Sequence, residues 1–212
     1  MASTRKAVVF DLGGVLARIC HSWQEAAEVA RVEHCLSPDQ KTPLADFYGF
    51  DQYQAGAIEL EAYLQGLAEF IGCESGHATA VHNSIIVEEY PGVNALVDEL
   101  RAHGYRLGCL SNTNPPHWEH LALNGAFPTI ASLDMKMASH LVGLNKPDPE
   151  IFRLYARQFE LEPTEIYFFD DNLPNVLAAQ REGWNAANIT PGEDTAQQMR
   201  AHLVTWGLLE PR

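Results

Sequence analysis

The sequence predicts an α/β fold, a doubly wound parallel sheet with an inserted α-helical cap. Short apolar segments alternate with helical segments from residue 92 onwards, as in a parallel sheet with crossover helices. Another apolar segment, Ala7–Phe10, stands alone near the N-terminus, and the intervening residues have helical periodicity without a convincing strand. We therefore expect an α/β core of residues 1–16 and 92–212 and a helical cap of residues 17–91.

The first predicted strand ends at a carboxylate. Ala7–Phe10 is apolar throughout, as expected for a strand buried on both faces of a sheet. Asp11 follows it directly, and Gly13 and Gly14 then allow the backbone to turn tightly and to approach a ligand closely. Open α/β sheets bind ligands at the carboxyl ends of their strands, so Asp11 is a candidate functional residue. A strand that simply ends in a turn is the alternative.

Helical signals dominate the predicted cap. Ser22 and Glu25 have the spacing of a capping box at a helix start. Apolar residues at helical spacing precede Gly72, a helix-ending glycine. We therefore expect helices over about 23–32, 60–71 and 77–86. The aromatic residues Phe47, Tyr48, Phe50 and Tyr53 are expected in the core of the cap, and a lining of the substrate pocket is the alternative.

The predicted core continues the alternation of helices and strands. Gly104 and Gly183 end helical segments, and Pro149 follows Asp148, a typical N-cap, at a helix start. Helices are expected over 93–103, 115–123, 149–159, 174–182 and 195–206. Strands are expected over 105–110, 129–133, 166–169 and 186–189.

Composition and charge restrict the function. The 212 residues are 46% hydrophobic and 20% charged, which allows a sizeable core and argues against disorder. The net charge of -14 argues against nucleic-acid and anionic-membrane partners, which need basic surfaces. No apolar segment approaches the roughly 20 residues of a membrane span. Four scattered cysteines without a CxxC pair, and an N-terminus without a signal-peptide core, favour a reduced cytoplasmic protein.

Polar residues follow several predicted strands and would share one edge of a parallel sheet. These residues are Asp11, Ser111, Asn112, Lys146, Asp170 and Asp171. Clustered carboxylates need a cation to stay ionised, and their oxygens suit Mg²⁺. Lysine, hydroxyl and backbone N–H groups suit phosphoryl oxygens, and an uncovered carboxylate can attack phosphorus. Singly, each group fits equally well in a polar turn, a solvated loop or a helix N-cap.

The order of these groups carries a family resemblance. The sequence resembles the haloacid dehalogenase-like superfamily of hydrolases over essentially the whole chain, within the phosphatase branch that carries a helical cap. Four segments match the motifs of that family in order: Phe10–Val15, Leu110–Thr113, Lys146–Pro149 and Phe169–Asn172. The second and fourth segments resemble most the glucose-1-phosphate phosphatase type. The segment between Phe127 and Ser139 is longer than usual for the family.

The resemblance implies catalytic and phosphate-binding roles. Asp11 would be the nucleophile that becomes an aspartyl phosphate. Ser111 and the backbone amide of Asn112 would hold phosphoryl oxygens, and Lys146 would neutralise both nucleophile and phosphate. The implied substrate is a small phosphorylated metabolite, such as a sugar phosphate.

The resemblance also implies a Mg²⁺ site. Asp11 and Asp171 would bind the ion directly, and Asp170 directly or through water. The backbone carbonyl of Gly13 would complete the protein ligands. The implied enzyme is therefore a Mg²⁺-dependent phosphatase.

Gly13 departs from the family pattern. Most phosphatases of the family carry an aspartate two residues after the nucleophile, where it protonates the leaving group and then activates water. Such acid–base help is worth about 10²–10⁴-fold in rate. Without it, the substrate has a good leaving group, another group such as His21 or Tyr48 supplies the proton, or the protein is a weakly active or non-catalytic binding protein. A 2-haloacid dehalogenase is a further alternative, but the Asp170–Asp171 pair favours the phosphatase.

Overall fold

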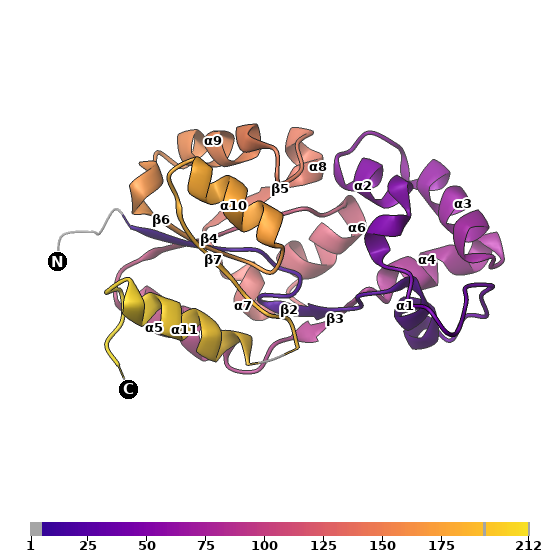
Figure 1. Ribbon diagram of the computed structural model, residues 1–212, viewed down its shortest axis with the longest axis horizontal. Coiled ribbons are helices and arrows are strands. Elements are labelled where there is room, and N and C mark those ends of the chain that lie inside the picture. Colours follow the sequence, from indigo (N-terminus) through magenta and orange to yellow (C-terminus); the bar gives the residue numbers. More distant parts are fainter. Residues whose placement is uncertain (1–5, 193, 212) are drawn as a thin grey trace.

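The computed structural model describes residues 6–192 and 194–211, and its central sheet has five parallel strands within that part of the chain (Figure 1). In spatial order, the strands are β5 (Met135–Ala138), β4 (Arg106–Ser111), β1 (Ala7–Phe10), β6 (Ile166–Asp170) and β7 (Asn185–Asn188). Strand β1 lies at the centre, and all four of its residues are fully buried. The predicted α/β class with a parallel sheet is confirmed.

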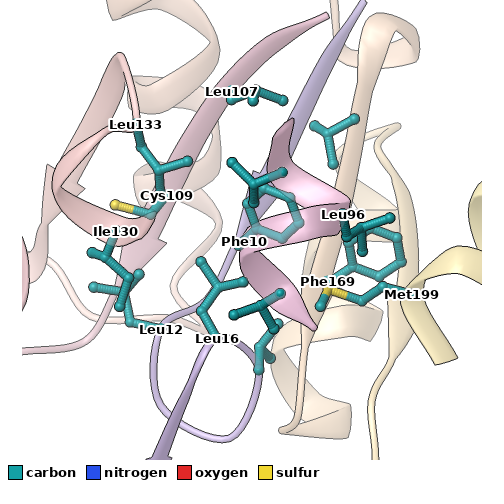
Figure 2. Packing of buried hydrophobic residues seen from close by; sticks show 14 of the residues in the cluster. Phe10, Leu12, Leu16, Leu96, Leu107, Cys109, Ile130, Leu133, Phe169 and Met199 are labelled. Atoms are coloured by element: carbon teal, nitrogen blue, oxygen red, sulfur yellow. The ribbon is translucent and has the colours of Figure 1, made fainter. Parts of the chain in front are cut away.

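Helices cover both faces of this sheet (Figure 1). One face packs against α9 (Pro149–Gln158) and α10 (Leu173–Arg181), and the other against α5 (Val93–Ala102) and α11 (Thr195–Thr205). Alternate residues of β1 supply the two cores, with Phe10 on the α5 side and Val9 on the α9 side. Figure 2 shows Phe10 and Phe169 packed beside Leu96 of α5 and Met199 of α11.

The region after β4 differs from its prediction. The expected strand over 129–133 is wrong, because Pro128 begins a short helix there, α7 (Pro128–Ala131), and strand β5 follows. Lys136 interrupts the apolar pattern of β5, and its Nζ donates to the carbonyl of Ala131 at 2.7 Å, at the end of α7. The remaining elements of this region are α6 (Pro115–Trp118), a π-helix (Glu119–Leu123), α8 (Ser139–Val142) and a 3-10 helix (Pro163–Glu165).

The inserted segment forms a helical lobe with its own core, at the right in Figure 1. Its elements are α1 (Trp23–Ala30), a 3-10 helix (Leu44–Asp46), α2 (Tyr48–Gln54), α3 (Leu60–Ile71) and α4 (Ser75–Asn83). Trp23 is fully buried there and packs edge-on against Phe47 and Phe50. Tyr48 is an exception to the predicted aromatic core, since it is 71% exposed.

The insert also contains strands, which corrects the expectation that residues 17–91 lack them. Strand β2 (Ala17–Ile19) pairs antiparallel with β3 (Ile86–Glu89), and together they join the core to the helical lobe. Both strands are too short to show a clear alternation of apolar and polar residues, and their register is irregular between Arg18 and Ile19. The boundaries at residues 17 and 91 stay a prediction.

Residues 1–5, 193 and 212 of the predicted core lie outside the described residues, and so does most of the N-terminal segment on which the absence of a signal-peptide core is predicted. Among the helices that are described, none combines the length and apolar character required to cross a membrane.

Candidate active site

The carboxyl ends of three neighbouring strands bring the predicted residues together. Asp11 directly follows β1, Ser111 ends β4 and Asp170 ends β6. The strand order β4–β1–β6 puts Asp11 between the other two. The backbone N–H of Asp11 donates to the carbonyl of Phe169 at 2.8 Å, which continues the pairing of β1 with β6 and fixes the start of the following loop.

Lys146 reaches this edge from the loop before α9 and is fully buried. Its Nζ lies 3.0 Å from Asp11 Oδ1 and 2.6 Å from Asp170 Oδ2, and it donates to the carbonyl of Leu110 at 2.8 Å. The three hydrogens of the ammonium thus have three acceptors. Burial acts to lower the pKa of Lys146, but the two carboxylates outweigh it and raise that pKa above its ordinary value. Lys146 therefore stays charged and ties the nucleophile candidate to Asp170.

Asp170 is fully buried and bonded at both oxygens. Its Oδ1 accepts from the backbone of Asn172 at 2.8 Å and from Asn175 Nδ2 at 3.0 Å, while Oδ2 accepts from Lys146. Asn175, in the first turns of α10, was missed by the sequence analysis. Asn175 lies five residues after Asp170. Because the chain passes from strand to helix between the two residues, this spacing matches neither the period of a strand nor that of a helix.

Asp11, Asp170 and Asp171 form a carboxylate cluster whose oxygens lie within 4.8 Å of one another. Burial raises the pKa of Asp11 to about 6, with Lys146 opposing the rise and the charge of Asp170 adding to it. Burial raises the pKa of Asp171 to about 7, with Asp11 and Asp170 acting in the same direction. Three carboxylates thus face one ammonium, and the excess negative charge and oxygen ligands fit Mg²⁺.

Two glycines bring the chain close to this cluster. Gly14 has φ +74°, and a Cβ atom there would collide with the carboxylate of Asp171. A Cβ on Gly13 would lie 3.0 Å from Cδ1 of Ile19 in β2. Asp171 therefore packs directly against bare backbone. The predicted proton donors His21 and Tyr48 are both exposed, and no hydrogen bond between described residues joins either side chain to the cluster.

The loop of residues 111–114 is anchored at its middle residues. Asn112 exchanges two hydrogen bonds of 2.8 Å with the backbone of Lys146, one as donor and one as acceptor. The backbone N–H of Thr113 donates to Ser139 Oγ at 2.9 Å. Ser111 is buried, yet its hydroxyl has no hydrogen bond with another described residue. That hydroxyl is therefore available to a ligand.

The insert contacts the same loop through the end of α2. Gln54 Nε2 donates to the carbonyl of Asn112 at 3.2 Å, and Ser139 Oγ donates to the carbonyl of Gln54 at 2.6 Å. Asn145 Nδ2 donates to the carbonyl of Asp51 at 3.0 Å. The helical lobe thus lies against the strand ends, over the loops that carry the candidate residues.

Comparison with known proteins agrees with this geometry. A family model described as haloacid dehalogenase-like hydrolase matches residues 5–183. The chain belongs to the haloacid dehalogenase-like hydrolase family, which confirms that resemblance and makes the chain a hydrolase. The narrower resemblance to the glucose-1-phosphate phosphatase type stays a prediction.

Three relatives illustrate the match. Sesquiterpene phosphatase astK of Aspergillus oryzae is 26% identical, with 94% of this chain and 97% of that protein covered. Validoxylamine A 7'-phosphate phosphatase of Streptomyces hygroscopicus subsp. limoneus is 24% identical, with 98% and 96% covered. The family enzyme bt-2542 of Bacteroides thetaiotaomicron, solved in complex with magnesium and inorganic phosphate, has a TM-score of 0.72 and 26% identity, with 92% of this chain and 99% of that chain covered.

Proposed function

We propose that this hydrolase is a Mg²⁺-dependent phosphatase that acts on a small phosphorylated metabolite through an aspartyl phosphate on Asp11. The observation that carries the proposal is the cluster of Asp11, Asp170 and Asp171 beside the buried ammonium of Lys146. Family membership and relatives named as phosphatases support phosphate esters as substrates. The magnesium and phosphate bound to bt-2542 support the same pair of ligands here.

Asp11 would act as the nucleophile. Both of its hydrogen bonds involve Oδ1, which accepts from the backbone of Leu12 at 2.7 Å and from Lys146. The other carboxylate oxygen would form the bond to phosphorus while the ester P–O bond breaks, and the departing oxygen would take a proton from water because Gly13 offers no acid. Water would then hydrolyse the acyl phosphate, which returns the Asp11 carboxylate and releases inorganic phosphate.

The remaining residues would bind and neutralise the phosphoryl group. The free hydroxyl of Ser111 and the backbone N–H of Asn112 would donate to its oxygens, and Lys146 would balance its charge. Mg²⁺ held by Asp11, Asp171 and the Gly13 carbonyl, with Asp170 as a ligand directly or through water, would supply the additional positive charge that the phosphoryl group needs.

The substrate would be a small molecule covered by the helical lobe. A cavity of about 410 Å³ lies between the lobe and the core, and its lining includes Tyr53, Ile58, Pro115 and His140. None of the candidate catalytic residues lines it, so it would take the part of the substrate that lies away from the phosphoryl group. A sugar-1-phosphate or an aryl phosphate, as an ester with a good leaving group, would suit Gly13, which offers no acid. The four free cysteines support a reducing compartment such as the cytoplasm.

Hydrolysis of para-nitrophenyl phosphate tests this function, because its leaving group needs no protein acid. We expect release of para-nitrophenolate with Mg²⁺ and none with EDTA. Asp11→Asn should lower kcat by at least about 10⁴-fold, as is usual when a nucleophile is removed, while its circular dichroism spectrum stays that of the wild type. Full activity of the folded variant, or release of halide from 2-haloacids that persists in EDTA, would contradict the proposal.

A further inference from the structure

A chain of buried polar groups joins the helical lobe to the end of loop 111–114. It runs from Tyr63 of α3 through His82 of α4 to Asn114 and then to His117 of α6. All four residues are buried, and Asn114 is fully so. The His82 and His117 rings stack with centroids 4.0 Å apart and planes at 5°. The phosphatase function proposed above uses none of these side chains directly.

Two backbone groups set the direction of the hydrogen bonds around Asn114. The N–H of His117 can only donate, so its partner at 3.2 Å is Asn114 Oδ1. The carbonyl of His82 can only accept, so His117 Nε2 at 2.9 Å carries a hydrogen. In a neutral ring, His117 Nδ1 then accepts from Asn114 Nδ2 at 3.2 Å.

The same logic extends to the lobe. His82 Nε2 lies 3.1 Å from Asn114 Oδ1, which is an acceptor, so this nitrogen donates. His82 Nδ1 is then left to accept from the hydroxyl of Tyr63 at 2.8 Å. Each of these hydrogen bonds then has one donor and one acceptor, provided that both imidazoles are neutral.

We propose that Tyr63, His82, Asn114 and His117 are a positioning network, through which the docked helical lobe holds the phosphoryl-binding loop in its working geometry. The inference rests on the proposed function. Asn114 ends the loop and is the N-cap of α6, and its Oδ1 takes the hydrogen bond from the lobe. Ser111 and Asn112, which would hold phosphoryl oxygens, are the first two residues of that loop. A displacement of the lobe would therefore move the phosphoryl ligands through Asn114.

Charge on His117 would break the network, because a second hydrogen on its Nδ1 would point at Asn114 Nδ2, which is itself a donor. Charge on His82 would instead reverse its bond with Tyr63, whose hydroxyl can accept as well as donate. The other titratable groups around the rings are Tyr53 of α2, and Glu119 and His120 of the π-helix. Burial lowers the pKa of His117 to about 4 and lowers the pKa of His82 as well, so the neutral network is present at pH 7.

Three histidine variants test the proposal. His82→Ala removes the donor to Asn114, and we expect kcat/KM for para-nitrophenyl phosphate to fall about 100-fold, chiefly in kcat, as for a displacement of about 1 Å at a reacting group. His82→Gln keeps an amide N–H that can donate to Asn114, and should restore most of that loss. His77→Gln, at an exposed position on the same helix α4, is the matched control and should leave kcat and KM unchanged.

Amide hydrogen exchange of residues 111–118 supplies a readout that does not need turnover. We expect faster exchange of this segment in His82→Ala than in His82→Gln, His77→Gln or the wild type. Wild-type kcat/KM together with unchanged exchange in a folded His82→Ala variant would overturn the positioning role. An inactive wild type that still shows faster exchange in His82→Ala would instead count against the phosphatase function and leave the coupling of lobe and loop supported.

Discussion

Ile19 occupies the space beside Gly13, since a Cβ atom at position 13 would lie 3.0 Å from Ile19 Cδ1. Ile19 belongs to β2, which pairs with β3, so its backbone is fixed by the strands that carry the lobe, while Cδ1 is the tip of its side chain. An acidic side chain at position 13 would therefore require Ile19 to shift by a few tenths of an ångström. We predict that Gly13→Asp alone gains less activity than it does with a smaller residue at position 19, because Ile19 crowds the new side chain.

The double variant Gly13→Asp with Ile19→Ala should accommodate the acid. For an alkyl phosphate, whose leaving group needs a proton, we expect kcat to rise by at least about tenfold, towards the 10²–10⁴-fold worth of general acid catalysis. The rate for para-nitrophenyl phosphate should change little. Ile19→Ala alone is the control, and an equal gain in that variant would mean that space rather than the acid limits the reaction.

Removal of the buried ammonium should destabilise the protein. Lys146→Met leaves Asp11 and Asp170 without their shared cation, and we expect the free energy of unfolding in EDTA to fall by about 3–5 kcal/mol. Lys136→Met, which removes an ammonium bonded to the carbonyls of Ala122 and Ala131, is the control and should cost less. Adding Asp170→Asn to Lys146→Met should recover part of the loss. Urea unfolding measures all four proteins, and a Lys146→Met variant as stable as the wild type would show that the cluster does not need its cation.

The raised pKa of Asp171 predicts how pH and Mg²⁺ act on stability. Its pKa is about 7 in the folded protein and about 4 when unfolded, so its ionisation favours the unfolded chain. The contribution of protonated Asp171 to the stability of the folded protein is complete below pH 4, and it is lost as the pH rises to 7. In EDTA, the free energy of unfolding of Asp171→Asn relative to that of the wild type should therefore rise by about 2–4 kcal/mol between pH 4 and pH 7.

Saturating Mg²⁺ should remove that difference or reverse it, because the wild-type carboxylate gains a cation that the amide binds poorly. Thermal melts of both proteins from pH 4 to pH 7, with EDTA and with Mg²⁺, provide the measurement. If the difference in stability between the two proteins does not change with pH, folding does not raise the pKa of Asp171.

The lowered pKa of His117 predicts the opposite trend. Its pKa is about 4 in the folded protein and about 6.5 when unfolded, so stability is unaffected above pH 6.5 and is lost as the pH falls towards 4. The loss attributable to this residue is up to about 3 kcal/mol. His117→Gln, which has no ionisable ring, should show a shallower decline in stability below pH 6.5 than the wild type. Parallel declines would exclude His117 as the titrating group.

The α/β core could be predicted because each long strand carries a complete local signal. The apolar run of β1 ends at Asp11, and that of β6 ends in the Asp170–Asp171 pair. The same stretch of sequence therefore predicts both the strand and the candidate site residue that follows it. Strand β2 has only three residues and gains its partner β3 about 70 residues later, which no local pattern records. The error at α7 has a different cause, since Pro128 is a local helix-start signal and the expected strand over 129–133 overlooked it.

The carboxylates and Lys146 could be listed from the sequence because the family motifs name them, and the structure brings them to one edge. The groups that position these residues could not be predicted from the sequence. His82 and Asn114 lie 32 residues apart and meet only because the lobe docks on the core. Asn175 reaches Asp170 through the turn from β6 into α10, a geometry that depends on the backbone rather than on residue spacing.

The paired strands β2 and β3 also bring the two ends of the insert next to each other. Ile19 is opposite Ile86, and the N–H of Cys20 donates to the carbonyl of Ile85 at 2.9 Å. Residues 20–85 thus form a single long loop whose two ends are held together by β2 and β3. The entropy cost of closing such a loop grows only slowly with its length. A longer or shorter insert between residues 20 and 85 would therefore leave the strand order and the carboxylate cluster of this chain in place.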